Sequence, residues 1–480
     1  MTEPLRAVGT LPAVSDELWR TSAVEAVGLL RAGEVSPLEL VEAALERIEQ
    51  VDGAINALPT VAADRARDAA RRAEPGSPLA GLPIAVKDLT DVAGVRTTYG
   101  SPIYADHVPD QSEAMVRRLE RRGAVVVAKS NTPEFGAGGN TFNEVFGETL
   151  NPWDTSLTCG GSSGGSAAAL AAGEVWLATG SDLGGSLRTP AGFCGVVGIR
   201  PTPGRVANGP SPLPFGTLAV EGPMGRSVAD AALMLDAMAG LDATDPLSLP
   251  EPPRPFLDAA SDPTLPARVA YSPDLGTTPV AGEVRDACER AVERLQHAGV
   301  AVDRVDLRLD DAPEAFQVLR ALGFVADMWE LHETERDRLK PDILWNIDRG
   351  LQLTPERIGW AERARGAVAR AVADVLETHE ALLCPTACVA PFDVSIRWPR
   401  EVDGVALDNY VEWLRITSAI TLTACPVVAM PCGLTADGLP IGMQVVGRFR
   451  GEWDLIAAAA ALERVWEMSA RVPRTPGAAS

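Results

Sequence analysis

The sequence predicts an α/β fold: one large domain over residues 1–480, built on a mixed, mostly parallel and twisted β-sheet with helices covering both faces. Two observations favour this fold. Short apolar, β-branched runs alternate with segments of helical periodicity, as is typical of buried parallel sheets. In addition, 46% of the 480 residues are apolar, so the chain can bury a large core.

The first hundred residues open with helices. Ser36-Pro37-Leu38-Glu39 combines an N-cap serine, a proline at the first helical position and a glutamate at N3, which is a capping box. An apolar face follows at helical spacing, formed by Val41, Ala44, Leu45 and Ile48. We interpret this helix as a structural element.

Two lysines each follow a predicted strand. Pro83–Val86 ends at Lys87, and Val125–Ala128 ends at Lys129. In open α/β sheets functional groups gather at the ends of the strands. Both lysines are therefore placed where chemistry can occur.

A proline-rich stretch over about 248–266 predicts an exposed surface excursion. Beyond it, Val284–Leu295 predicts a helix that Gly299 ends, and Val300–Leu307 predicts a strand. The α/β alternation resumes there, so we expect the excursion to interrupt one fold.

The charge balance excludes some partners. With 43 basic and 65 acidic residues, the net charge is −22, which repels nucleic acids and anionic membrane surfaces. The Met1–Leu11 segment lacks the apolar core of a secretory signal. The best candidate for a membrane span, Ile420–Met430, contains Pro426 and is too short. We expect a cytoplasmic protein.

The cysteines indicate no metal. Their number is odd, most lie in apolar or glycine-rich runs, and we interpret them as reduced core thiols. Cys384 and Cys388 form a C-x3-C pair, which alone is weak evidence for a metal. The seven positions are Cys159, Cys194, Cys288, Cys384, Cys388, Cys425 and Cys432.

Two glycine-rich turns carry the most unusual pattern. Cys159–Ser166 leads into the alanine-rich run Ala167–Ala172, and a second turn spans Ser181–Arg188. Glycines let the backbone approach a ligand, and a following helix exposes its N-terminal N–H groups. The serines of the two Gly-Gly-Ser sequences, Ser162 and Ser186, are 24 positions apart (186 − 162).

Three interpretations of these turns compete. A phosphate loop requires a lysine beside the glycines, which is missing. Structural turns with capping hydroxyls would suit Ser163 and Ser166. Nucleophilic catalysis requires a base near the serine, and a buried lysine with a lowered pKa can act as one. The four histidines lie far from both turns in sequence: His107, His297, His332 and His379.

Several ordered motifs together resemble the amidase-signature hydrolases. They are densest over about 81–203, with C-terminal elements over about 381–465. The segments that carry the resemblance are Gly81–Asp88, Lys129–Phe135, Asn151–Trp153, Gly160–Ser166, Asp182–Arg188, Leu383–Thr386 and Gly438–Gln444.

The resemblance implies the amidase-signature fold and catalysis without cofactor or metal. Ser186 would be the nucleophile that forms an acyl-enzyme. Ser162, expected after a cis peptide bond, would shuttle the proton to Lys87, the neutral base. The N–H groups of Leu183, Gly184, Gly185 and Ser186 would form the oxyanion hole.

The resemblance also implies supporting residues. Ser163, Asp182 and Arg188 would hold the serines and their turn by hydrogen bonds. The positions expected to line the substrate cleft are Gly138, Gly139, Asn140 and Trp413. Family members often carry threonine at positions 181 and 183; Ser181 keeps the hydroxyl, whereas Leu183 changes the side chain beside the oxyanion hole.

The substrate class stays open at this point. Trp413 and the apolar run Ile416–Ala424 favour an uncharged aryl or alkyl amide, with carbamates and esters as alternatives for the same triad. Glu412 is the only acid in Val411–Arg415, which disfavours a subunit of a glutamine amidotransferase. A catalytically silent binding subunit is a further alternative. We expect a monomer or homodimer acting on a small molecule.

Overall fold

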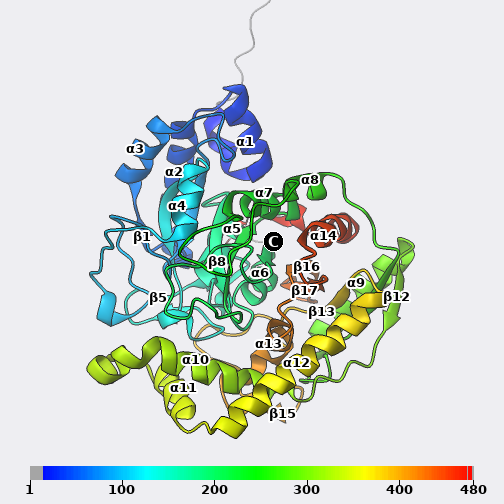
Figure 1. Ribbon diagram of the computed structural model, residues 1–480. Coiled ribbons are helices and arrows are strands. Elements are labelled where there is room, and N and C mark those ends of the chain that lie inside the picture. The colour runs from blue at the N-terminus through cyan, green and yellow to red at the C-terminus, as the bar shows by residue number, and fades with distance from the viewer. Residues whose placement is uncertain (1–13, 473, 478–480) are drawn as a thin grey trace, which may run out of the picture.

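The computed structural model describes residues 14–472 and 474–477 (Figure 1). The Met1–Leu11 segment lies outside the described residues. An 11-stranded sheet runs through the molecule in the order β1-β3-β2-β8-β10-β9-β16-β17-β13-β11-β12. Its strands are β1 (Thr60–Val61), β2 (Pro83–Lys87), β3 (Val125–Ser130), β8 (Leu177–Asp182), β9 (Val197–Arg200), β10 (Val220–Gly225), β11 (Arg268–Tyr271), β12 (Ala301–Arg304), β13 (Leu382–Pro385), β16 (Val427–Leu434) and β17 (Pro440–Val446).

Three two-stranded sheets, fourteen α-helices and six short 3-10 helices accompany this sheet in the described part of the chain. The short pairs are β4 (Phe142–Asn143) with β5 (Gly147–Glu148), β6 (Leu150–Asn151) with β7 (Asp154–Thr158), and β14 (Glu401–Val402) with β15 (Val405–Ala406). The helices are α1 (Ala23–Ala32), α2 (Pro37–Ile55), α3 (Ala63–Arg72), α4 (Ala114–Arg121), α5 (Gly164–Ala172), α6 (Arg188–Cys194), α7 (Val228–Met238), α8 (Phe256–Ser261), α9 (Gly282–His297), α10 (Ala312–Glu335), α11 (Pro341–Leu351), α12 (Pro355–Thr378), α13 (Arg415–Thr421) and α14 (Glu452–Trp466).

The α/β class and the mixed sheet are confirmed, but the prediction of a mostly parallel sheet is wrong. The parallel neighbours are β2 with β3 and β8, and β11 with β12 and β13. The other six pairs are antiparallel. The reason lies in the connections: β16 and β17 form a hairpin, and β10 inserts between β8 and β9 without the helical crossover that parallel neighbours need.

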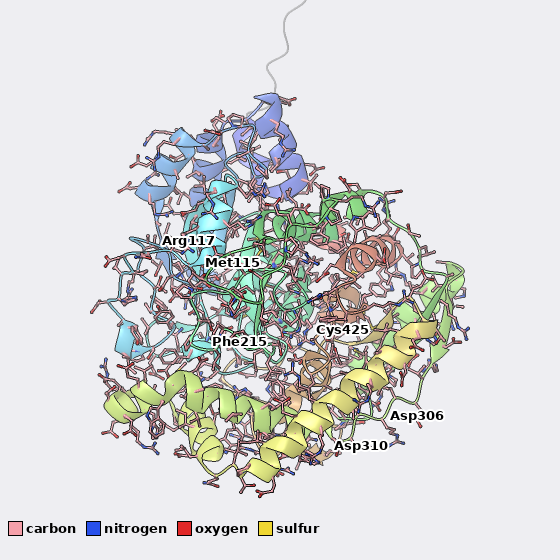
Figure 2. All side chains as sticks on the ribbon, in the orientation of Figure 1. Met115, Arg117, Phe215, Asp306, Asp310 and Cys425 are labelled. Carbon is pink, nitrogen blue, oxygen red and sulfur yellow. The ribbon has the colours of Figure 1, made fainter. Side chains whose placement is uncertain are left out.

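The core lies on both faces of the sheet, because side chains alternate along each strand. Ala85 and Val127 belong to the cluster that α2 and α5 cover. Ile84 and Val126 belong to the larger cluster on the other face, together with residues of α1, α7 and α14. Figure 2 shows side chains filling these layers, whereas Asp306 and Asp310 lie at the periphery.

Most predicted local elements agree with the structure. Ser36 and Glu39 form the capping box that opens α2, and β2 and β3 include both lysines as strand residues. The strand predicted over Val300–Leu307 is shorter in the structure. Its partner β11 ends at Tyr271, opposite Arg304, so the residues beyond have no strand to pair with.

The proline-rich stretch is not wholly exposed, which corrects the prediction for 248–266. It contains α8, whose Phe256 and Ala259 are buried. The carboxylate of Asp236 accepts the N–H groups of Phe256 and Leu257, at 2.6 and 2.9 Å, and so satisfies the start of this helix. The assignment of a single domain remains a prediction.

All seven cysteines are buried free thiols, in agreement with the prediction of core thiols. Within residues 14–472 and 474–477, no helix combines the length and apolarity needed to cross a membrane.

The start of α5 packs directly on the loop that follows β3. A Cβ added at Gly165 would lie 2.3 Å from the backbone nitrogen of Asn131 and 2.7 Å from the carbonyl oxygen of Ala57. Both are backbone atoms, which cannot rotate away. Only a glycine therefore lets α5 reach this position.

We predict that Gly165→Ala lowers the free energy of unfolding by about 1–3 kcal/mol, because the added methyl group overpacks this contact. The measurement is urea-induced unfolding. The matched control is Gly28→Ala in α1, where an added Cβ meets no atom within 4 Å. This variant should raise the free energy of unfolding by about 0.5–1 kcal/mol, because alanine favours a helix more than glycine does. Equal stability of the two variants would contradict the account.

Candidate active site

The two glycine-rich turns and the end of β2 meet at one place. Lys87 is the last residue of β2, Ser162 and Ser163 precede α5, and Ser181 lies near the end of β8. β2 pairs with β8 in parallel, so these strand ends lie side by side. The N–H of Ser163 donates to the carbonyl oxygen of Ser186 at 3.1 Å, which joins the two turns.

Lys87 is fully buried among hydroxyl groups. Its Nζ lies 2.7 Å from Ser162 Oγ, 2.9 Å from Ser163 Oγ and 2.9 Å from Ser181 Oγ. Among the described residues, no carboxylate lies within ion-pair distance of this amine. Burial lowers the pKa of Lys87 far below the ordinary lysine value, although the charges of Glu221 and Asp182 oppose this shift.

Lys129 provides a contrast on the neighbouring strand. It is equally buried, but its Nζ lies 3.2 Å from the carboxylate of Asp88. The same nitrogen donates to the Thr90 carbonyl oxygen and to Thr97 Oγ1. Lys129 is thus held as half of a buried ion pair, whereas Lys87 faces three serine hydroxyls.

The turn before α5 matches the expectation for Ser162. The peptide bond between Gly161 and Ser162 is cis. A Cβ at Gly161 would lie 3.0 Å from the carbonyl carbon of Gly139, so this turn touches the loop predicted to line the substrate cleft.

Elements distant in sequence support the turn that contains Ser186. Thr417 Oγ1, from α13, donates to the Gly184 carbonyl oxygen at 2.6 Å. Gly185 has a φ of +121°, and a Cβ there would lie 2.4 Å from the same hydroxyl. The ring of Phe316, from α10, would lie 3.1 Å from a Cβ at Gly184. Thr417 and Phe316 were not predicted, since their positions in sequence give no sign of this proximity.

The prediction for the oxyanion hole needs one correction. The N–H of Gly185 donates to Asp182 Oδ1 at 3.0 Å, so it is already occupied. The N–H groups of Leu183, Gly184 and Ser186 have no acceptor within the described part of the chain. Their role in an oxyanion hole remains a prediction.

A buried ionic network fixes the same turn. Asp182 is fully buried, and Arg188 donates to both its oxygens, with Nη2 at 2.8 Å and Nε at 3.0 Å. Arg200 Nη1 lies 3.2 Å from Oδ1. The Leu187 N–H adds a further hydrogen bond. Burial alone would raise the pKa of Asp182, but the two guanidinium groups hold it well below its usual range.

The residues predicted for the substrate cleft form a closely packed group. A Cβ at Gly139 would lie 2.3 Å from the Trp413 ring, which is buried and stacks on Phe193. The Asn140 amide is engaged by the protein, since it donates to the Ile396 carbonyl oxygen and accepts from Thr158 Oγ1. Gly138 lies beside Lys340. Their contact with a substrate remains a prediction.

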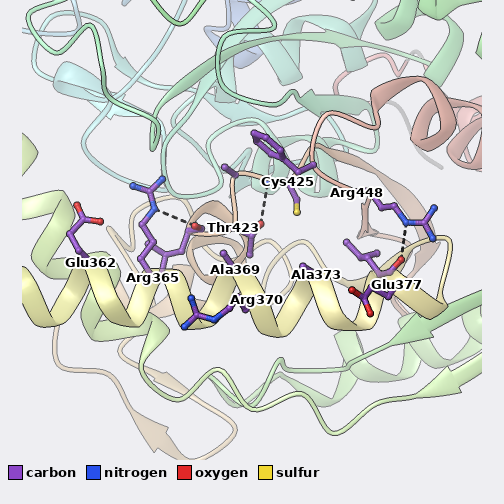
Figure 3. Close-up of a pocket in the computed structure, with 14 residues that line it drawn as sticks. Glu362, Arg365, Ala369, Arg370, Ala373, Glu377, Thr423, Cys425 and Arg448 are labelled. Atoms are coloured by element: carbon purple, nitrogen blue, oxygen red, sulfur yellow. Dashed lines mark hydrogen bonds between the residues drawn. The ribbon is translucent and has the colours of Figure 1, made fainter.

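A groove of about 700 Å³ lies elsewhere, between α12 and the segment after α13 (Figure 3). Arg365, Ala369, Ala373, Thr423 and Cys425 are among its lining residues. None of the predicted site residues lines it, so it is distinct from the site at Lys87. Within the described ranges, no cluster of three or more histidine, cysteine or acidic side chains is arranged to bind a metal.

Comparisons with known proteins extend over nearly the whole chain. A family model described as Amidase matches residues 39–456. The chain is 35% identical to an acylamidase from Rhodococcus erythropolis, covering 92% of this chain and 95% of that protein. It is 34% identical to a glutamyl-tRNA(Gln) amidotransferase subunit from Moorella thermoacetica, and the match covers 95% of this chain and 99% of that protein. The structure of a bacterial aryl acylamidase of the amidase signature family superimposes with a TM-score of 0.87 at 29% identity, covering 96% of this chain and 99% of that one.

We predict that Asp182→Asn lowers the free energy of unfolding by about 3–5 kcal/mol, because it leaves two buried guanidinium groups without their carboxylate. Urea-induced unfolding measures the change. Asp306→Asn is the control, since Asp306 pairs with Arg308 on the surface; its effect should stay within about 0.5 kcal/mol. If Asp182→Asn lowered the free energy of unfolding by less than about 1 kcal/mol, the effect would be that of a surface ion pair. That result would refute the structural role of this network.

Proposed function

This chain belongs to the amidase family, and on that premise we propose that it is an amidohydrolase that cleaves carboxamide C–N bonds through an acyl-enzyme on Ser186. The observation that carries the proposal is the environment of Lys87. A buried amine surrounded by three hydroxyl oxygens and by no paired carboxylate is suited to act as a neutral base.

In the proposed mechanism a proton moves along the three side chains. Lys87 takes the proton of Ser162, Ser162 takes that of Ser186, and Ser186 Oγ bonds to the substrate carbonyl carbon. The N–H groups of Leu183, Gly184 and Ser186 stabilise the resulting oxyanion. The proton then returns through Ser162 to the leaving nitrogen as the C–N bond breaks. Water hydrolyses the ester and regenerates Ser186.

Apolar side chains near the turns favour an uncharged acyl group. Phe316 lies beside Gly184, and Trp413 lies against Gly139. The similarity to an acylamidase and to an aryl acylamidase supports the same choice. Aryl or alkyl amides are therefore the proposed substrates. Carbamates and esters are the second candidates, because the same acyl-enzyme chemistry serves them.

A role as a glutamine amidotransferase subunit has less support, despite the similar identity to such subunits. A free glutamine substrate carries a charged α-amino group, which needs an available carboxylate. Glu412, the acid expected nearest that position, is committed to Arg415 at 2.6 Å and to the Asp408 N–H at 2.9 Å. Glu412 is therefore not available to receive the substrate's α-amino group.

We predict that the purified protein hydrolyses anilides and alkyl amides in a panel that also contains primary amides, carbamates and p-nitrophenyl esters. Lys87→Met should lower the rate on anilides by about a hundredfold to ten-thousandfold, because the general base is lost. Ser186→Ala should abolish the reaction and the mass adduct with a fluorophosphonate.

Ser156→Ala provides the matched control, since Ser156 is exposed and its hydroxyl donates only to Asp154 among the described residues. It should keep full activity and full labelling. A fluorophosphonate adduct that persists in Ser186→Ala would exclude Ser186 as the nucleophile. Near-normal anilide hydrolysis by Lys87→Met, with circular dichroism unchanged, would exclude the lysine base.

A further inference from the structure

Glu221 lies next to the predicted base without being part of any motif. It belongs to β10, where it pairs directly with Ser181 of β8. Directly paired residues of antiparallel strands point to the same face, with their Cβ atoms about 5 Å apart. Because Ser181 Oγ lies 2.9 Å from Lys87 Nζ, the Glu221 carboxyl adjoins the group of hydroxyls around the amine.

One oxygen of this carboxyl has no partner. Glu221 Oε2 is inaccessible to solvent and forms no hydrogen bond with any described residue. Leaving a buried carboxyl oxygen unpaired is costly, so this oxygen calls for an explanation. Burial accordingly raises the pKa of Glu221 well above the usual value, and Glu113 raises it further.

The other charges around this position are already committed. Asp182 is neutralised by Arg188 and Arg200. Glu113, just before α4, accepts the Asp91 N–H at 3.0 Å, and its own pKa is raised by burial. Lys129 pairs with Asp88.

Two carboxyl charges act on Lys87, those of Glu221 and Asp182. Because Asp182 is already paired with Arg188 and Arg200, Glu221 is the one of the two without an ion-pair partner among the described residues. The Lys87 charge favours the ionised form of Glu221, and the Glu221 charge favours the protonated form of Lys87. Each side chain is thus the electrostatic partner of the other, with Ser181 between them.

We propose that Glu221 is a positioning residue of this reaction, whose carboxylate strengthens Lys87 as a base and supplies the counter-charge for the ammonium that forms when Ser162 gives up its proton. This inference rests on the proposed function of the same site. Burial alone would leave the amine too weak a base, and Glu221 restores part of its basicity. The proton leaves Lys87 again when the amine product departs, so no net charge remains.

The test is the rate at which a fluorophosphonate labels Ser186, measured against pH for the wild type and Glu221→Gln. The rate should rise with pH as Lys87 loses its proton. An ionised Glu221 raises the pKa of Lys87, so its removal should move the midpoint of this rise to lower pH by about one unit or more. The plateau rate should fall by about threefold to tenfold, because a weaker base removes the proton less readily.

Glu174→Gln is the matched control. Glu174 is a fully buried carboxyl whose pKa is likewise raised by burial, but its charged neighbours are Asp52 and Arg47. It should leave the pH profile unchanged. If Glu221→Gln does not fold, Glu221→Asp replaces it, and its midpoint should shift in the same direction by a smaller amount.

The outcomes separate the two proposals. A wild type that forms no Ser186 adduct at any pH would overturn the proposed function itself. A wild type that labels normally, with a Glu221 variant whose profile superimposes on it, would overturn only the role of Glu221. A purely structural role would lower the amount of folded protein and leave the midpoint in place.

Discussion

The burial of the Lys87 amine, which makes no direct ion pair with any described residue, is the constraint on which the rest of this site depends. Lys87 is the last residue of β2, a strand whose residues are all buried. A charged ammonium there would lose its hydration, so the neutral form is favoured. The hydroxyls of Ser162, Ser163 and Ser181 meet the hydrogen-bonding needs of that form.

The fold keeps the Lys87 amine apart from two buried ionic clusters. Lys129 and Asp88 compensate each other one strand away. On the other side, Arg188 and Arg200 compensate Asp182 while the same carboxylate binds the N–H groups of Gly185 and Leu187. The ionic network thereby holds the Ser186 turn rigid without placing an ion pair on Lys87. Preorganisation of this kind reduces the rearrangement that an acyl-transfer reaction requires.

Local sequence patterns predicted the parts of the site that lie on continuous segments. The ends of β2 and β3 and both Gly-Gly-Ser turns are encoded by short apolar runs and glycines, which act within a few residues. The antiparallel insertion of β10 was not predictable, because strand pairing over long separations leaves no local periodicity. For the same reason the sequence did not reveal that Thr417, Phe316 and Glu221 approach these turns. The Gly185 N–H was assigned to the oxyanion hole because the motif does not show that Asp182 occupies it.

The most direct test of the central claim is the protonation state of Lys87, measured by NMR on protein labelled with ¹³Cε-lysine. The chain has three lysines, Lys87, Lys129 and Lys340, so the spectrum is simple and Lys87→Met assigns its signal. The account predicts that this signal titrates far below the ordinary lysine pKa of about 10.4. Titration at or above that value would show that Lys87 is charged in the free protein, and would contradict its role as the base.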